Sequence, residues 1–191
     1  MDSRAVNLKK TTRWALFVPL LLCLFFGVAL YYAMGNDPYN HDSIQQNKPI
    51  PMFSAENLLD SGKTITHEEF YQKISLLNVW ASWCGVCQTE HAFLLQLASQ
   101  PDVTLYGLNY RDQKSKAIEL LEKKGNPFTK ILFDPQGKLA IELGVYGTPE
   151  TYLIDQNGII RFRYSGPLTS DSWQTVFVPQ IDAINVNRGE Q

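Results

Sequence analysis

The sequence is poor in the residues that mark a metal centre, a disulfide framework or a nucleic-acid-binding surface. It has three cysteines and three histidines among 191 residues, and charged residues make up only 19%. The formal net charge is −2, so no excess of Lys and Arg indicates binding to nucleic acid. No internal repeat or low-complexity segment is present. The composition therefore excludes a nucleic-acid-binding protein, a repeat protein and a disulfide-rich scaffold.

One long segment near the N-terminus, Trp14 to Met34, has no charged side chain. As a helix it would measure roughly 31 Å, enough to cross the hydrocarbon core of a bilayer. The basic residues that precede it are Arg4, Lys9, Lys10 and Arg13, and the acidic residues that follow it are Asp37 and Asp42. The positive-inside rule then places the N-terminus in the cytoplasm and the rest of the chain outside it.

A cleaved signal peptide is the competing interpretation of this segment. The apolar region is long for a signal peptide, and a cut after Ala33 would put the bulky Tyr31 at the −3 position. We therefore predict an uncleaved anchor over 14–34, preceded by a cytoplasmic N-terminus over 1–13. Residues 35–50 are polar and contain two prolines, which is typical of a linker, and 51–191 have the size of one domain.

The motif Trp83-Cys84-Gly85-Val86-Cys87 lies where an apolar run typical of a strand meets an amphipathic helical pattern. Two cysteines three positions apart at the start of a helix are one turn apart, close enough to form a disulfide. We expect Cys84 at the positive end of the helix dipole, which stabilises a thiolate and lowers the pKa of the thiol. The spacing predicts Cys84 as the nucleophile of thiol–disulfide exchange and Cys87 as the resolving cysteine.

The residues alone leave two other uses of this cysteine pair open. A zinc site has the same spacing but needs more ligands, and the remaining cysteine, Cys23, lies in the separate apolar segment. His91, four residues after Cys87, would complete only a three-ligand cluster, so we predict no metal site and no cofactor. A purely structural disulfide is the other alternative, although so short a loop stabilises a fold little.

The rest of the soluble part alternates strands and helices. An apolar run over 74–81 predicts a central strand buried on both faces, followed by a helix from Cys84 to about Ser99. Further strands are predicted over 63–66, 103–109, 131–133, 151–155 and 159–164, and helices over 67–73, 114–124, 138–143 and 170–184. Asn157-Gly158 predicts a type I′ hairpin, and Ser170 or Asp171 would cap the last helix, which Pro179 disturbs. This order suggests a thioredoxin-like α/β fold, a central mixed sheet flanked by helices.

Three segments, LLNVWASWCGVCQTEH, GLNY and GVYGTPETYLIDQNGIIRFRYSG, closely resemble the CcmG (DsbE) family. Its members are membrane-anchored, thioredoxin-like thiol:disulfide interchange proteins of bacterial cytochrome c maturation. The resemblance extends from about Lys48 to the final helix. It implies that the Thr148–Pro149 peptide bond is cis, faces the disulfide and offers the Thr148 backbone to an extended substrate. Trp83 would shield the cysteine pair.

The sequence departs from ordinary thioredoxins six residues before the first cysteine, where Asn78 replaces a buried aspartate. An amide cannot accept a proton, so another group must handle the proton of Cys87. Glu90, one turn after Cys87, and Glu150, next to Pro149, are the candidate acids. Each has a structural alternative, because Glu90 also suits the helix dipole and Glu150 could be an exposed surface residue.

The resemblance implies a protein-disulfide reductase on the periplasmic side of the bacterial inner membrane. Its client would be the C-x-x-C-H haem-attachment segment of an apocytochrome c, or a mixed disulfide with another maturation factor. A membrane electron donor of the DsbD type would restore the dithiol. The alternatives are a general periplasmic disulfide oxidase or isomerase, and a non-enzymatic binding or metallochaperone module on the same fold.

Overall fold

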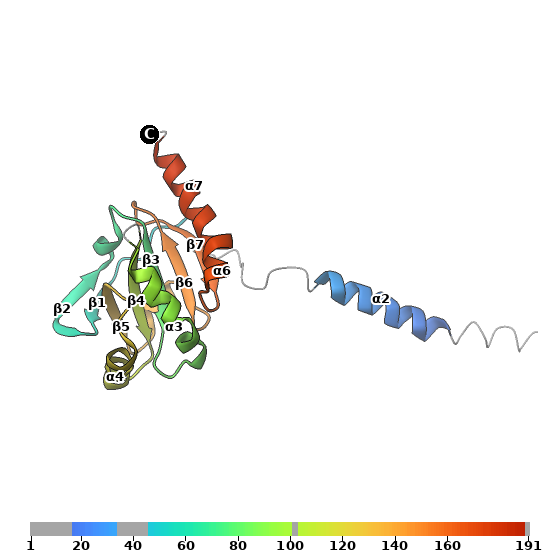
Figure 1. The fold of residues 1–191 in the computed structure, drawn as a ribbon, viewed down its shortest axis with the longest axis horizontal. Coiled ribbons are helices and arrows are strands. Elements are labelled where there is room, and N and C mark those ends of the chain that lie inside the picture. The colour runs from blue at the N-terminus through green and yellow to red at the C-terminus, as the bar shows by residue number, and fades with distance from the viewer. Residues whose placement is uncertain (1–16, 34–45, 101–102, 190–191) are drawn as a thin grey trace, which may run out of the picture. The chain divides into compact units, whose positions relative to one another are not determined.

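The computed structural model describes residues 17–33, 46–100 and 103–189. These fall into two compact units, 1–38 and 39–191. The described part of the first unit is one helix, and the second unit contains all the other elements (Figure 1). The predicted N-terminal segment 1–13 and linker residues 35–45 lie outside the described residues.

Helix α2 (Phe17–Ala33) is the described part of the predicted membrane anchor. Its 17 residues amount to about 25 Å of helix, which is shorter than the hydrocarbon core of a typical bilayer. No helix in the described ranges is both long and apolar enough to cross a membrane. The structure therefore does not support the transmembrane helix predicted over 14–34, of which residues 14–16 and 34 are not described.

The second unit is built on a seven-stranded mixed sheet with the order β2-β1-β5-β4-β3-β6-β7. The strands are β1 (Ser54–Asn57), β2 (Asp60–Thr66), β3 (Ser75–Trp80), β4 (Thr104–Tyr110), β5 (Lys130–Asp134), β6 (Glu150–Ile154) and β7 (Ile160–Ser165). The three central strands β3, β4 and β5 are parallel, and the outer strands pair antiparallel. All six residues of β3 are buried, as the apolar run predicted.

Helices cover both faces of this sheet. One face carries α3 (Gly85–Ala98), α4 (Lys114–Lys124), α6 (Ser170–Ser172), the π-helical segment η2 (Trp173–Phe177) and α7 (Val178–Gly189); the other carries the 3₁₀ helix η1 (His67–Phe70) and α5 (Lys138–Glu142). Figure 1 labels α3, α4, α6 and α7. Alternation along β3 separates the two cores, because Leu76 and Trp80 pack with α3 and Leu77 and Val79 with α5. The predicted thioredoxin-like α/β fold is confirmed.

Strand β1 (Ser54–Asn57) was not predicted. Its four residues are Ser-Ala-Glu-Asn, and none of them is fully buried. It has neither the apolar alternation nor the branched residues that mark a strand in a sequence, and it is held by backbone pairing with β2 and β5. Its partner β2 begins three residues earlier than the predicted 63–66.

The turn between β6 and β7 is not the predicted type I′ hairpin. That turn needs positive φ at both central residues, and in the described residues Gly158 has a φ of 73° whereas Asn157 is not among those with positive φ. The Asp155 carboxylate accepts the N–H groups of Asn157 and Ile159, both at 2.9 Å. These hydrogen bonds favour a wider turn, in which only Gly158 has a left-handed backbone conformation.

The residue that caps the C-terminal helical region is not one of the two predicted. Thr169, rather than Ser170 or Asp171, caps α6: its hydroxyl accepts the N–H of Ser172 and the Ser172 hydroxyl accepts the N–H of Thr169. The π-helical segment η2 ends at Phe177, two residues before Pro179, which is the second residue of α7. Proline lacks an N–H and crowds the carbonyl four residues back, which explains the local widening of the helix.

Candidate redox-active site

The end of β3 delivers Cys84 to the N-terminus of α3. Cys84 is the N-cap residue of this helix and forms a disulfide with Cys87, with the two Cα atoms 5.3 Å apart. Its sulfur accepts the backbone N–H of Cys87 at 3.1 Å. A negative charge on this sulfur would therefore be stabilised by an N–H group and by the helix dipole.

The loop before β6 lies beside Cys84. The Thr148–Pro149 peptide bond is cis, as the resemblance implied, and the carbonyl oxygen of Thr148 lies 3.7 Å from the Cys84 sulfur. Pro149 is buried and Thr148 half-buried. The site therefore combines a disulfide at a helix N-terminus with an irregular strand edge, where an extended peptide can add backbone hydrogen bonds.

Trp83, next to Cys84, is an exposed residue and not part of the hydrophobic core. Its side chain is 59% exposed, and its indole N–H donates to the backbone oxygen of Arg111 at 3.0 Å. Val86, in the first turn of α3, and Tyr146, in the loop before β6, are also exposed apolar residues. This surface offers apolar side chains to a partner that approaches Cys84.

Glu90 is buried under the cysteine pair with only 1% of its surface exposed. Its carboxylate accepts the Leu168 backbone N–H at 2.6 Å and the Asn78 side-chain amide at 3.0 Å, and no ion pair to it is described. Burial raises the pKa of Glu90 to about 7, and these two hydrogen bonds oppose the rise. Glu90 can therefore exchange a proton near neutral pH.

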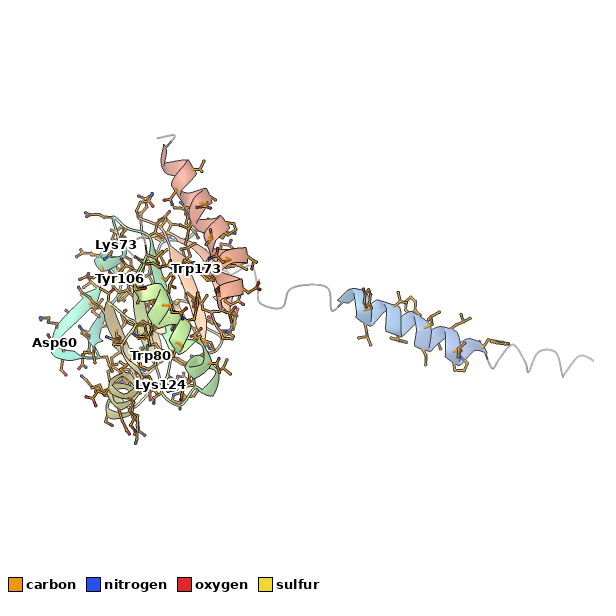
Figure 2. All side chains as sticks on the ribbon, viewed as in Figure 1. Asp60, Lys73, Trp80, Tyr106, Lys124 and Trp173 are labelled. Carbon is orange, nitrogen blue, oxygen red and sulfur yellow. A yellow bond between two sulfur atoms is a disulfide. The ribbon has the colours of Figure 1, made fainter. Side chains whose placement is uncertain are left out.

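A small cavity of about 10 Å³ touches both Cys87 and Glu90. Its lining residues are Asn78, Trp80, Cys87, Glu90, His91, Leu94, Leu120 and Phe128. Among the described residues, Asn78 Oδ1 and Trp80 Nε1 have no hydrogen-bond partner. Trp80, labelled in Figure 2, stacks on Phe128 with ring centroids 5.5 Å apart. A volume of this size with polar groups on its wall is about what one water molecule needs.

Asn78 connects the sheet to Glu90. Its amide nitrogen donates to Glu90 Oε1 at 3.0 Å and to the Thr151 hydroxyl at 3.1 Å. The residue that replaces the thioredoxin aspartate is thus a hydrogen-bond donor to the acid that lies next to it. The buried acid at this site therefore lies on helix α3, and the strand β3 supplies an amide.

Glu150 has a different environment from Glu90, and the exposed alternative considered for it is wrong. It is 2% exposed and pairs with Arg163 through two hydrogen bonds of 2.8 and 3.0 Å. It also accepts the N–H groups of Tyr146 and Gly147 and the Tyr152 hydroxyl. Burial, followed by the Glu150 charge, raises the pKa of Tyr152, which keeps this hydroxyl protonated as a donor. Glu150 therefore organises the loop before Pro149.

Sequence reasoning missed Arg163 and Leu168 as partners of the two acids. Arg163 alternates with the buried Phe162 and Tyr164 in β7, and this alternation is typical of a strand with one exposed face, so the pattern did not indicate that Arg163 is buried. Leu168 contributes only its backbone, so its side chain carries no signal of the contact either. His91, considered above as a metal ligand, donates instead to the Gly125 carbonyl at 3.0 Å. No group of three His, Cys, Asp or Glu side chains in the described ranges could hold a metal ion.

Comparison with known proteins agrees with this geometry. The redoxin family matches residues 45–176. Thiol:disulfide interchange protein DsbE of Vibrio cholerae is 44% identical over 86% of this chain and 91% of its own length, and that of Escherichia coli K12 is 43% identical over 87% and 93%.

Among solved structures, a DsbF homologue from Corynebacterium diphtheriae superposes with a TM-score of 0.64 at 22% identity, over 78% of this chain and 94% of its own. At that identity the superposition supports the fold alone. The identity to the curated relatives, which extends over most of both chains, supports the activity. The chain belongs to the redoxin family and, within it, to the DsbE thiol:disulfide interchange proteins, which are oxidoreductases.

Proposed function

We propose that this chain reduces disulfides on the periplasmic side of the bacterial inner membrane during cytochrome c maturation. The client is the C-x-x-C-H segment of an apocytochrome c, or a mixed disulfide between that segment and another maturation factor. The observation that carries the proposal is the Cys84–Cys87 pair at the N-terminus of α3, beside the cis-proline loop and above a buried acid. The DsbE relatives support the same chemistry.

The reaction begins on the dithiol form. The Cys84 thiolate attacks one sulfur of the client disulfide, that S–S bond breaks, and the first client sulfur leaves as a thiolate. Cys87 then attacks the Cys84 sulfur in the mixed disulfide, and the second client sulfur leaves. Two electrons pass from the Cys84–Cys87 dithiol to the client, which takes up two protons.

Glu90 accepts the proton of Cys87 in the second step. Its pKa of about 7 leaves a substantial fraction as carboxylate at neutral pH, and it shares a small cavity with Cys87. One water molecule in that cavity would bridge the sulfur and the carboxylate, with Asn78 Oδ1 and Trp80 Nε1 as its other partners. Glu150 has no part in this transfer, since its oxygens are engaged by Arg163 and the 146–147 backbone.

A membrane electron donor of the DsbD type re-reduces the Cys84–Cys87 disulfide. In this proposal residues 14–34 anchor the chain in a single pass, with the N-terminus in the cytoplasm. The absence of charge over 14–34 and the basic residues before it support that topology. Extraction of membranes with alkaline carbonate tests it: the proposal expects the full chain in the pellet, and release of the intact chain into the supernatant would contradict an anchor.

The experiment that identifies the client is a trap in the native membrane. Cys87→Ser, combined with Cys23→Ser, leaves Cys84 unable to release its mixed disulfide, so the partner stays bound. We expect capture of a cytochrome maturation component, of an apocytochrome c, or of the membrane electron donor. Cys84→Ser with Cys23→Ser is the matched control and should trap none of these. Capture of mainly unrelated secreted proteins would favour a general oxidase or isomerase.

The direction of electron flow has its own test. Equilibration of the Cys84–Cys87 pair in glutathione buffers measures its reduction potential. A reductant requires a value near that of thioredoxin, about −270 mV, whereas a value near that of DsbA, about −120 mV, would make the chain an oxidant and exclude the proposal.

A further inference from the structure

The loop that follows β4 contains Asp112, and each of its two carboxylate oxygens accepts two hydrogen bonds. Asp112 Oδ2 accepts the Ser82 backbone N–H at 2.5 Å and the Asn109 amide at 3.0 Å. Its Oδ1 accepts the Ser82 hydroxyl at 2.7 Å and the Gln113 N–H at 2.8 Å. Asp112 is half-buried, and hydrogen bonds to a charged acceptor are the stronger kind. The β4–α4 loop is therefore tied firmly to Ser82.

Ser82 belongs to the short connection between β3 and α3, two residues before Cys84. Its carbonyl oxygen accepts from Gln88 Nε2 at 3.1 Å, and Gln88 in turn accepts from Lys124, which Figure 2 labels. The Cys84 N–H donates to the Ala81 carbonyl at 3.2 Å. The backbone that leads into Cys84 is thus fixed at successive residues, with Asp112 contributing two of the contacts.

The residue before Asp112 holds Trp83. Arg111 has a φ of 47°, in the left-handed region that non-glycine residues adopt rarely. Its carbonyl accepts the Trp83 indole N–H at 3.0 Å, and its own N–H donates to the Asp134 carbonyl at 3.0 Å. Backbone conformations of this kind persist where neighbours hold them and are concentrated at functional sites. One loop therefore contacts both residues that precede Cys84.

We infer that Asp112 is a positioning residue for Cys84. Through Ser82 it keeps the Cys84 sulfur at the N-terminus of α3, within reach of the Cys87 N–H at 3.1 Å, and it keeps the adjoining Arg111 carbonyl against Trp83. No bond to Asp112 forms or breaks. The inference rests on the proposed function, because it concerns how fast Cys84 attacks a client disulfide.

The first test replaces Asp112 in the full chain that also carries Cys23→Ser. Asp112→Ala removes all four hydrogen bonds, and we expect the rate constant for reduction of a synthetic Cys-x-x-Cys-His disulfide peptide to fall about tenfold, since small displacements of a reacting atom slow reactions strongly. Asp112→Asn retains one acceptor oxygen for the Ser82 N–H and should recover most of the rate.

Asp155→Ala is the matched control for loss of stability. Asp155 also holds a loop, by accepting the Asn157 and Ile159 N–H groups and pairing with Arg161. Its loop follows Ile154, which pairs with Ser75 at the end of β3 farthest from Cys84. This variant should lose stability and keep the wild-type rate. Unchanged reduction by Asp112→Ala, or equal slowing by both variants, would overturn the inference.

The pH dependence of Cys84 alkylation by iodoacetamide in the dithiol form gives a second readout. Asp112→Asn removes a negative charge and should move the midpoint downward. Asp112→Ala removes the same charge but also frees the loop, so its midpoint should lie above that of Asp112→Asn; identical midpoints would overturn a positioning role. A wild-type chain that cannot reduce the peptide would contradict the proposed function, whereas this alkylation comparison would still decide the role of Asp112.

Discussion

Two buried glutamates in the elements that form the redox-active site have opposite environments. Glu90, on α3, receives two hydrogen bonds and has no described cation beside it, and burial raises its pKa to about 7. Glu150, on β6, receives a bidentate Arg163 guanidinium, two backbone N–H groups and a tyrosine hydroxyl. The first can gain or lose a proton, whereas the second forms an ion pair with Arg163 and holds the loop before Pro149.

The difference shows that burial alone does not identify a catalytic acid. Both side chains are almost fully buried, and both belong to segments that resemble the CcmG (DsbE) family. What separates them is the number of donors that compensate the negative charge. A carboxylate with few donors, next to a cavity and a sulfur, suits proton transfer, whereas one paired with arginine suits the ordering of a loop.

The largest expected effect comes from removing the compensated acid. Glu150→Ala leaves the buried Arg163 without its carboxylate, and breaking a buried ion pair destabilises by about 3–5 kcal/mol. Urea unfolding measures this loss, and Glu122→Ala, an exposed glutamate on α4, is the control that should change stability little.

A double replacement sharpens the same test. Glu150→Leu with Arg163→Met removes both charges, so no uncompensated charge stays buried and most of the stability should return. Equal losses in the single and double variants would show that the pair is not what stabilises this region.

The next effect is a pH dependence that belongs to Glu90. Its folded pKa of about 7 exceeds the ordinary value of 4.5, so the folded state holds a proton that the unfolded state has released between these values. The free energy of unfolding should therefore fall as pH rises through this interval, by up to about 3 kcal/mol, and level off above it. Urea unfolding across that pH range measures the fall.

Glu90→Gln is the comparison for this slope, because glutamine does not titrate. Its unfolding free energy should lack the decline that the wild type shows, whatever its absolute value. Parallel pH profiles for the two proteins would place the Glu90 pKa near its ordinary value and remove the difference between the two acids.

Strand β3 and helix α3 were predictable from the sequence because the residue patterns that indicate them are local. The apolar run of β3 and the periodic pattern of α3 gave both elements within a residue or two, and with them the position of Cys84. Strand β1 was missed because backbone pairing with β5, far along the chain, holds a segment of four residues of which three are polar. The Asn157-Gly158 turn was misassigned because the Asp155 side chain competes for its backbone.

The site was predictable only in part, for a similar reason. The cysteines, Pro149 and both acids were named from local motifs, but motifs could not separate the two acids. Their environments come from Arg163, thirteen residues from Glu150, and from the Leu168 N–H, seventy-eight residues from Glu90. A sequence pattern does not report which backbone groups reach a buried carboxylate.

A third prediction concerns the space beside Glu90. A Cβ atom at Gly107 would lie 2.8 Å from Trp80 Nε1 and 3.0 Å from the Phe128 ring, both of which line the cavity. Gly107→Ala should therefore overpack this side and destabilise by about 1–3 kcal/mol, with slower resolution by Cys87. Thermal unfolding and the release rate of the mixed disulfide measure the two effects. Wild-type values for both would mean that the cavity has no part in the reaction.

The smallest expected effect concerns Asn78. Asn78→Leu keeps the number of side-chain heavy atoms but removes the amide that donates to Glu90, so the pKa of Glu90 should rise by about one unit. An NMR titration of the Glu90 carboxyl carbon checks this. A pKa that falls or stays the same would show that Asn78 does not stabilise the charged acid.

The central claim is that Cys84 is the attacking thiolate, and selective alkylation tests it most directly. In the reduced full chain with Cys23→Ser, mass spectrometry after brief iodoacetamide treatment should find Cys84 modified and Cys87 protected, with a midpoint below the ordinary cysteine pKa of about 8.5. A Cys84 thiol that stays unmodified at neutral pH, or a Cys87 that reacts first, would contradict the account.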